Sequence, residues 1–225
     1  GSRANFAGND KVAEIFARLG PFDYGGKSLV NTEYRLNDVR MKDGKMFVGQ
    51  FKANTDVCEG KGLEVGRRGA IYEGWWRDDK PNGRGRLIQA GGSIYIGDLV
   101  DGKPQGKGEL QSEDGTTYTG QFKRGRKHGT GVFVWKNGAR YHGSFLNGKR
   151  AGTGFYLYPN GDVYDGAWDN NERHGNGCFL WTRDKRRFEG RCQRDMRTGF
   201  GRTAKSGNLY EGQWLDGKRH GFGIV

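Results

Sequence analysis

The sequence predicts an all-β protein, an elongated single-layer antiparallel sheet of stacked β-hairpin repeats of about 23 residues with a short N-terminal helix. Three observations lead to this prediction. An aromatic-glycine pattern recurs eight times at nearly constant spacing, and Asx-Gly pairs separate many of its segments. Glycine supplies 42 residues and aromatic side chains 13%, while all hydrophobic residues together reach only 33%. Because one hairpin cannot bury its rings alone, such repeats are stable only when they stack.

The repeat consists of an aromatic residue followed by x-Gly-x-aromatic, six variable residues and Gly-x-Gly. A clear copy runs from Tyr118-Thr119-Gly120-Gln121-Phe122 to Gly129-Thr130-Gly131. The leading aromatic residues are Phe47, Tyr72, Tyr95, Tyr118, Tyr141, Tyr164, Phe188 and Tyr210. The steps between them are 25 residues, then 23 four times, then 24 and 22. Spacing this regular indicates one supersecondary unit repeated along the chain.

Alternation along a β-strand puts the two aromatic residues and the intervening glycine of each copy on one face. The Gly-x-Gly pair shares a face of the return strand in the same way, and we expect these glycines to make room for a flat ring on the neighbouring strand. Dipeptides that favour positive φ stand at the predicted turns. Those within a copy are Asp101-Gly102, Arg124-Gly125, Asn147-Gly148 and Asp216-Gly217, and those between copies are Asp114-Gly115, Asn137-Gly138, Asn160-Gly161 and Ser206-Gly207.

The pattern YxGxWxxGxxxGxG resembles the MORN (membrane occupation and recognition nexus) repeat, with Tyr210-Glu211-Gly212-Gln213-Trp214 and Gly221-Phe222-Gly223 as one example. The resemblance covers about eight repeats over residues 47–225. The copy at Phe47 has a delayed Gly-x-Gly, and the copy at Phe188 has Cys192 where tryptophan is expected. The resemblance implies the hairpin array and roles in membrane tethering, cell-division scaffolds or ciliary structures. It does not single out one function.

Residues 1–46 precede the array and are expected to form a separate N-terminal part. An amphipathic helix is predicted at about residues 9–19, because four apolar residues follow i, i+3, i+4, i+7 spacing: Val12, Ile15, Phe16 and Leu19. Residues 22–46 are expected to form a degenerate hairpin. Helix and hairpin together would cap the first sheet edge; alternatively the helix docks a partner or a second copy of the chain. Because the sequence stops just after a motif, we expect the 47–225 array to belong to a longer protein.

The net charge of +12 favours an acidic partner, such as anionic lipid or an acidic protein surface. From the second repeat onward, at least one cation stands eight or nine residues after the leading aromatic residue, so stacking should align these cations along one edge as a basic ridge. The residues of this ridge are Lys103, Arg126, Lys127, Lys149, Arg150, Arg173, Arg197, Lys218 and Arg219. Such a row could bind an anionic membrane. Alternatively, the turns simply prefer soluble residues.

The middle of the array carries an excess of apolar side chains, which indicates a second candidate surface. Aromatic residues on the glycine side are expected to form a shallow groove for an extended or helical peptide. The predicted groove consists of Phe133, Trp135, Tyr156, Tyr158, Phe179, Trp181, Tyr118, Tyr141 and Tyr164. The opposite side of the same strands is apolar too, at Val132, Val134, Phe155, Leu157, Cys178 and Leu180. Because a single-layer sheet with two apolar faces must cover both, a partner or another part of the protein is expected there.

Catalytic and metal sites are not indicated. His128, His174 and His220 occupy one repeat position, two repeats apart, about 20 Å from one another at ordinary strand spacing, so we interpret them as turn residues. No glycine-rich motif follows a parallel strand to open a helix. Three cysteines without a CxxC pair favour a reducing compartment. Nucleic-acid binding is disfavoured because the rings are committed to packing between hairpins.

The sequence therefore predicts a non-catalytic, cofactor-free scaffold that binds a protein partner through a peptide or helix, in the cytoplasm near a membrane or cytoskeletal structure. Two alternatives stay open: binding of an anionic phospholipid such as a phosphoinositide through the basic ridge, and a regulatory role in a larger enzyme such as a lipid kinase. Pairing into a homodimer also stays open.

Overall fold

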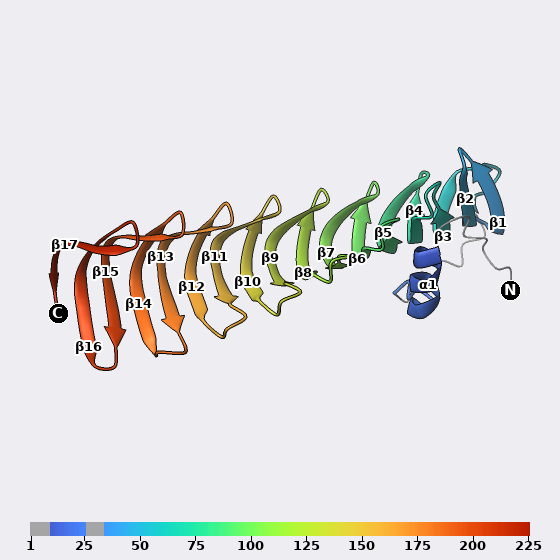
Figure 1. Cartoon of the computed structure of the whole chain (residues 1–225). Helices are drawn as coiled ribbons and strands as arrows, with labels where there is room; N and C mark the ends of the chain where they lie inside the picture. The colour runs from blue at the N-terminus through green and yellow to red at the C-terminus, as the bar shows by residue number, and fades with distance from the viewer. Residues whose placement is uncertain (1–9, 26–33) are drawn as a thin grey trace. The chain divides into compact units, whose positions relative to one another are not determined.

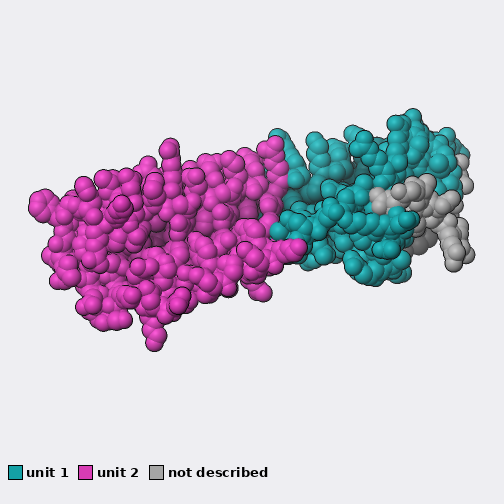
Figure 2. Space-filling view, viewed as in Figure 1, with its two compact units in different colours: residues 1–125 teal, residues 126–225 magenta. Residues whose placement is uncertain are grey.

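The computed structural model describes residues 10–25 and 34–225, which form one helix and seventeen strands (Figure 1). The strands belong to two compact units, Gly1–Gly125 and Arg126–Val225 (Figure 2). Within each unit every strand pairs antiparallel with its neighbours in the chain, and the only helix among the described residues is N-terminal. The prediction of an all-β array of stacked hairpins with a short N-terminal helix is confirmed.

Unit 1 contains the helix and the first strands of the array. Its elements are α1 (Asp10–Leu19), β1 (Tyr34–Lys42), β2 (Lys45–Lys52), β3 (Cys58–Val65), β4 (Ile71–Arg77), β5 (Lys80–Ile88), β6 (Ile94–Val100), β7 (Lys103–Gln111) and β8 (Thr117–Lys123). The pairing register puts glycine opposite glycine in the hairpins β2–β3, β4–β5 and β6–β7, as with Gly74 and Gly85. The described part of the chain contains no helix with the length and apolar character needed to cross a bilayer.

Unit 2 continues the same pattern. Its elements are β9 (Arg126–Val134), β10 (Arg140–Leu146), β11 (Lys149–Leu157), β12 (Val163–Asp169), β13 (Glu172–Trp181), β14 (Arg186–Gln193), β15 (Met196–Lys205), β16 (Asn208–Leu215) and β17 (Lys218–Ile224). Two-residue turns with positive φ close the hairpins, as predicted at Asn147-Gly148 and Asp216-Gly217. The connections between hairpins also turn at glycine, with Gly138 and Gly161 at positive φ.

The two glycines of Gly-x-Gly have different roles, which corrects the expectation that both make room for rings. Gly154, the second of its pair, lies opposite Gly143, and a Cβ on Gly154 would approach the ring of Tyr141 to 2.5 Å. The first, Gly152, has φ +66° and sits where the register slips between Gly143 and Phe145. It therefore supplies the left-handed backbone of a β-bulge rather than space for a ring.

The leading residue of the repeat is tyrosine because both its ring and its hydroxyl group make contacts in the fold. Tyr141 Oη donates to the carbonyl of Ser144 at 3.0 Å, three residues along the same strand, and Tyr164 does the same to Ala167 at 3.0 Å. Trp168 Nε1 donates to the carbonyl of Gly154 at 2.9 Å, which joins one hairpin to the one before it. The aromatic core thus satisfies its own polar atoms while the rings stay fully buried.

Helix α1 packs on a face of the unit 1 sheet rather than over its first edge (Figure 1). Its apolar stripe contacts a cluster of aliphatic residues on β3 to β6. The buried members are Val12, Val65, Ile71, Ile88 and Ile94, with Ile15, Phe16, Leu19, Met46, Leu63 and Ile96 packed around them. The helix spans Asp10–Leu19 of the predicted 9–19, and its position follows from the apolar face available on the sheet.

Residues 20–25, the described residues that follow α1, contain no strand. Tyr24 packs edge-on against Trp75 with ring centroids 6.1 Å apart, and its carbonyl accepts a hydrogen bond from Trp75 Nε1 at 3.1 Å. Strand β1 (Tyr34–Lys42) pairs with β2. Residue 9 of the predicted helix and residues 26–33 of the predicted hairpin lie outside the described residues.

We expect the array to lose stability as the pH rises from about 10 to about 12. Burial raises the pKa of Tyr141 from its ordinary value of 10.0 to about 12, and burial likewise raises that of Tyr24 to about 12. The folded state binds the phenolic proton more tightly, so this contribution is complete below pH 10 and falls as the unfolded chain ionises first. Urea unfolding at stepwise pH measures the loss. Native tyrosine absorbance that titrates fully near pH 10 would contradict the prediction.

Candidate functional site

Each hairpin has two unlike faces. The ring face is the one that carries the leading aromatic residue of each repeat, and the back face is the opposite one. On the ring face of unit 2, Tyr141 meets Phe145 edge-on at 5.1 Å and Trp168 at 5.3 Å, and Tyr164 meets Trp168 at 5.2 Å. All four rings are buried, with 5% or less of each exposed. They form a continuous floor beneath the surface.

A second layer of rings from the return strands lies beside this floor. Its six members form an unbroken chain with centroid separations of 4.5, 5.1, 4.5, 5.4 and 4.3 Å. In order these are Phe133, Trp135, Tyr156, Tyr158, Phe179 and Trp181. Five are partly exposed, whereas Phe179 is 9% exposed. The structure therefore brings together six of the nine residues predicted for the groove.

The remaining three predicted groove residues are inaccessible. Tyr118, Tyr141 and Tyr164 are 1%, 0% and 1% exposed. Because almost none of their surface is exposed, a ligand on the ring face cannot contact these three rings directly. Tyr141 and Tyr164 support the groove of unit 2 from below, and Tyr118 belongs to the core of unit 1.

Cationic side chains fold over the rings. Arg150 is centred 4.3 Å from the Trp168 ring and 5.2 Å from that of Tyr156. The other cations over unit 2 rings follow the same arrangement. They are Lys127 over Phe133 at 4.2 Å, Arg173 over Phe179 at 5.4 Å, Arg186 over Trp181 at 4.0 Å, and Arg197 over Trp214 at 4.3 Å. These five cations and the six rings of the second layer are called the cation–aromatic ladder. Four of the nine predicted ridge residues thus lie over the predicted groove, so the two predicted surfaces overlap in part.

The ridge divides according to position in the repeat. Residues nine places after the leading aromatic lie on the ring face, where Arg150 is opposite Phe145 and Arg173 is opposite Trp168. Residues eight places after it are exposed at the turn. These exposed members are Lys103 in unit 1 and Arg126, Lys149 and Lys218 in unit 2. Arg219 reaches back over the Tyr210 ring at 4.3 Å.

The ladder holds more positive charge than its own carboxylates neutralise. Arg173 pairs with Asp195, with Nε and Oδ1 2.9 Å apart. Among residues 126–225, neither Arg150 nor Arg197 has a carboxylate within ion-pair distance. Burial lowers the pKa of Lys127, and neighbouring Arg150 lowers it further. Burial also lowers the pKa of Arg150. Cations held together in this way favour an anionic ligand.

The histidines do not form a site, and they are not turn residues as predicted. His128 and His174 lie inside β9 and β13, next to the glycines at the bulges. Within the described ranges, no group of three or more His, Cys, Asp or Glu residues is placed to hold a metal ion. Arg186 was absent from the predicted sites because it stands outside the repeat register. It pairs with Trp181 across β13 and β14 and shares the face of Phe188, so alternation along β14 could have found it.

The family model for the MORN repeat matches six segments of the chain. They are residues 72–94, 95–117, 118–140, 141–163, 164–184 and 210–224, which together make up more than half of it. The chain belongs to the MORN repeat family. The MORN repeats that the family model does not match begin at Phe47 and Phe188, the two copies that depart from the motif. In both, phenylalanine replaces the tyrosine whose hydroxyl bonds back to its own strand, although both still form hairpins.

Several solved structures are similar to this MORN chain at low identity. The TCP domain of SAS-4 (dCPAP) of Drosophila melanogaster, in complex with a proline-rich motif of Ana2 (dSTIL), is 14% identical with a TM-score of 0.42, over 68% of this chain and 83% of that chain. The TCP10 domain of Danio rerio CPAP, in complex with a peptide of STIL, is 12% identical with a TM-score of 0.45, over 80% and 82%. TM-scores this low carry no argument about function. No curated protein matches the chain.

Proposed function

We propose that this MORN array is a non-catalytic scaffold that binds an extended acidic peptide along the cation–aromatic ladder of unit 2. The observation that supports the proposal is the overlap, on one face, of partly exposed rings with a row of cations, of which Arg150 and Arg197 have no carboxylate partner among residues 126–225. Rings offer apolar contact to aliphatic or proline side chains, and guanidinium groups offer paired donors to carboxylates. Together they suit a peptide that has both kinds of residue.

The repeat spacing favours an extended peptide over a helix. Each repeat contributes two strands, so equivalent residues of successive repeats lie about 10 Å apart along the ladder. Three residues of a polyproline II helix advance by about 9.3 Å, so a peptide running along the array presents one residue per repeat at every third position. Arg150, Arg173 and Arg197 recur once per repeat, as do Trp135, Tyr158 and Trp181. A carboxylate at every third residue would therefore stay in register over several repeats.

A labelled (Glu-Pro-Pro)5 peptide tests the proposal by fluorescence polarisation. We expect it to bind, and Arg150→Gln to weaken binding about tenfold or more, because a charged hydrogen bond contributes about 1.5–3 kcal/mol. Lys149→Gln is the matched control, since it removes the same charge one residue away at an exposed position whose Nζ donates to Asn170 Oδ1. Arg150→Lys keeps the charge and should still lose affinity, because an ammonium group lacks the planar, two-pronged donor set of guanidinium.

Two results would contradict the proposal. The first is equal binding of a peptide with the same composition in scrambled order, because the repeat register would then play no part. The second is equal loss from Lys149→Gln and Arg150→Gln. The lipid alternative predicts that second pattern with phosphatidylserine vesicles, since a membrane would meet the exposed cations at least as readily as those folded over rings. Circular dichroism of each variant checks that the array remains folded.

A further inference from the structure

The cation–aromatic ladder ends at Trp181, where two guanidinium groups meet one ring. Arg186 Cζ lies 4.0 Å from the centroid of the Trp181 ring, and Arg197 Cζ lies 5.8 Å from the same centroid. Arg186 is paired opposite Trp181 across β13 and β14, whereas Arg197 belongs to β15. Burial lowers the pKa of Arg197, and the charge of Arg186 lowers it further. The two guanidinium groups are thus close enough to repel each other.

The second layer of rings stops at the same place. Opposite the leading residue of a repeat, the return strand carries Tyr156 in the repeat of β10 and β11 but Thr203 in that of β14 and β15. Trp135 stacks on Tyr156 with ring centroids 5.1 Å apart, so the equivalent neighbour of Trp181 is a threonine in place of a ring. Lys205 stands at the repeat position that Trp181 has in the repeat before it. Beyond Trp181 the ring face therefore carries cations where the ladder carries rings.

These cations outnumber the carboxylates beside them. The Oδ2 atom of Asp184 lies 3.2 Å from Lys205 Nζ and 4.0 Å from Arg186 Nε. The buried Arg186 Nε has no hydrogen-bond partner among the described residues. Arg197 Nη2 donates to a neutral acceptor, the carbonyl of Gly217, at 2.5 Å. Three cations thus share one carboxylate, which leaves two positive charges at this end of the ladder.

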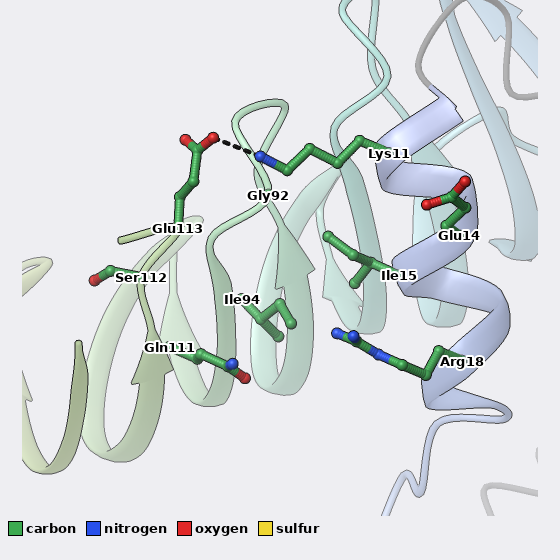
Figure 3. A pocket seen from close by; sticks show the side chains of 9 residues that line it. All are labelled: Lys11, Glu14, Ile15, Arg18, Gly92, Ile94, Gln111, Ser112 and Glu113. Atoms are coloured by element: carbon green, nitrogen blue, oxygen red, sulfur yellow. Dashed lines mark hydrogen bonds and ion pairs between the residues drawn. The ribbon is translucent and has the colours of Figure 1, made fainter. Parts of the chain in front are cut away.

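The pocket between α1 and the sheet of unit 1 shows the opposite case. Its lining includes two cations, Lys11 and Arg18, and two carboxylates, Glu14 and Glu113. Figure 3 shows Lys11 reaching across to Glu113, where its Nζ lies 2.5 Å from Oε1. Positive and negative charges balance in this pocket, so it offers an anion no excess of positive charge.

We infer that Arg186 and Arg197 form a site beside Trp181 for the phosphoryl group of a bound peptide. The inference rests on the proposed peptide-binding function and adds that the peptide is recognised in a phosphorylated form. A phosphorylated side chain carries about 1.5 to 2 negative charges at neutral pH and three acceptor oxygens, whereas a carboxylate carries one charge. It therefore matches the two positive charges and accepts hydrogen bonds from both guanidinium groups at once. A peptide is favoured over a membrane lipid, because both groups lie over rings and do not project from a turn.

Two derivatives of the (Glu-Pro-Pro)5 peptide test the inference with the full chain. One has phosphoserine in place of the first glutamate and the other in place of the last, because the peptide can run along the ladder in either direction. By fluorescence polarisation we expect at least one of them to bind about tenfold more tightly than the glutamate peptide. Arg186→Gln should reduce this gain to about twofold or less. Arg187→Gln is the matched control and should keep the gain, because it removes the same charge from the back face, where Arg187 pairs with Glu189.

Inorganic phosphate provides a second measurement that needs no peptide. We expect it to shift the indole N–H signal of Trp181 in NMR spectra of the wild-type chain, relative to chloride at equal ionic strength, and not in Arg186→Gln. If phosphate shifts this signal but none of the peptides binds, the phosphoryl site stands and the proposed peptide function fails. If the glutamate peptide binds but neither phosphopeptide gains affinity, the proposed function stands and the inference is overturned.

Two further outcomes would also overturn the inference. A gain that persists in Arg186→Gln would mean that the phosphopeptide responds to the general positive charge of the chain. Vesicles with phosphatidylinositol 4-phosphate that bind the wild-type chain but not Arg186→Gln, without a gain for either phosphopeptide, would assign the phosphoryl group to a lipid. Because the Arg186 side chain is 39% exposed, its substitution should leave the array folded, which circular dichroism of both variants checks.

Discussion

Replacing Gly154 by valine should destabilise unit 2 by about 3 kcal/mol or more, the upper range for adding atoms to a packed core. A Cβ at this position would lie 2.5 Å from Cε2 and Cζ of Tyr141. The ring cannot move aside, because Phe145 and Trp168 hold it edge-on at 5.1 and 5.3 Å. Strand propensity alone predicts the opposite sign, with valine favoured over glycine by up to about 1 kcal/mol. The clash is larger than the propensity, and urea unfolding of the full chain measures the difference.

A double-mutant cycle shows whether the ring is the cause. Tyr141→Ala alone should cost about 3–5 kcal/mol, but the variant carrying both Tyr141→Ala and Gly154→Val should lose much less than the sum, because valine then occupies space that the ring has left. Gly91→Ala is the glycine control. It stands in a turn with ordinary φ, where a Cβ meets only Glu113 Oε2 at 3.3 Å, and should change stability by about 0.5 kcal/mol or less. Simple additivity of the two core substitutions would refute the explanation.

Spacing predicted the architecture because register and alternation follow from counting residues. The 23-residue step and the positions of Asn147-Gly148 and Asp216-Gly217 were enough to place the hairpins. Counting could not distinguish the two glycines of Gly-x-Gly. Both stand on one face by parity, yet Gly152 lies in a bulge and Gly154 lies under a ring, and only the backbone geometry separates them.

The candidate site was predicted in part for the same reason. Phe133, Tyr156 and Phe179 were expected together because they share parity and repeat position. Arg150 also shares the parity of Gly154, which was a usable signal, but grouping it with Lys149 as one turn concealed that the two side chains lie on opposite faces. The burial of Tyr141 depends on how closely hairpins stack, and parity carries no information about that distance.

For the N-terminal helix, the periodicity of the sequence predicts the helix but not the place where it packs. Spacing of Val12, Ile15, Phe16 and Leu19 defined the helix, but its docking position depends on which part of the sheet is apolar on its back face. Ile71, Ile88 and Ile94 provide that surface. Only the pairing register of the strands shows that these residues lie side by side on the back face.

Removing Glu73 should destabilise unit 1 by about 3–5 kcal/mol, the cost of leaving a buried charge without its partner. Arg86 is 3% exposed and stands on the back face beneath α1, where its Nη2 lies 2.6 Å from Glu73 Oε2. Its other contacts are the carbonyl of Gly20 at 2.8 Å and the rings of Phe16 and Phe22. None of these neutralises the guanidinium. In Glu73→Ala we therefore expect faster amide hydrogen exchange in α1 and in β4 to β6, with unit 2 unchanged.

Replacing both Glu73 and Arg86 distinguishes two quantities: the free-energy cost of leaving Arg86 buried without a partner, and the net contribution of the ion pair to stability. A double variant with Glu73→Leu and Arg86→Met keeps approximate volume and should be within about 1 kcal/mol of the wild-type chain, or more stable, since apolar replacements of buried pairs are often neutral or favourable. Unit 2 already has Val132 and Phe155 at the repeat position of Arg86, so the fold accepts apolar residues there. If Glu73→Ala costs less than about 1 kcal/mol, then water reaches Arg86 and the helix does not seal this face. If the double variant is as unstable as the single one, the pair itself, rather than the orphaned charge, holds α1 on the sheet.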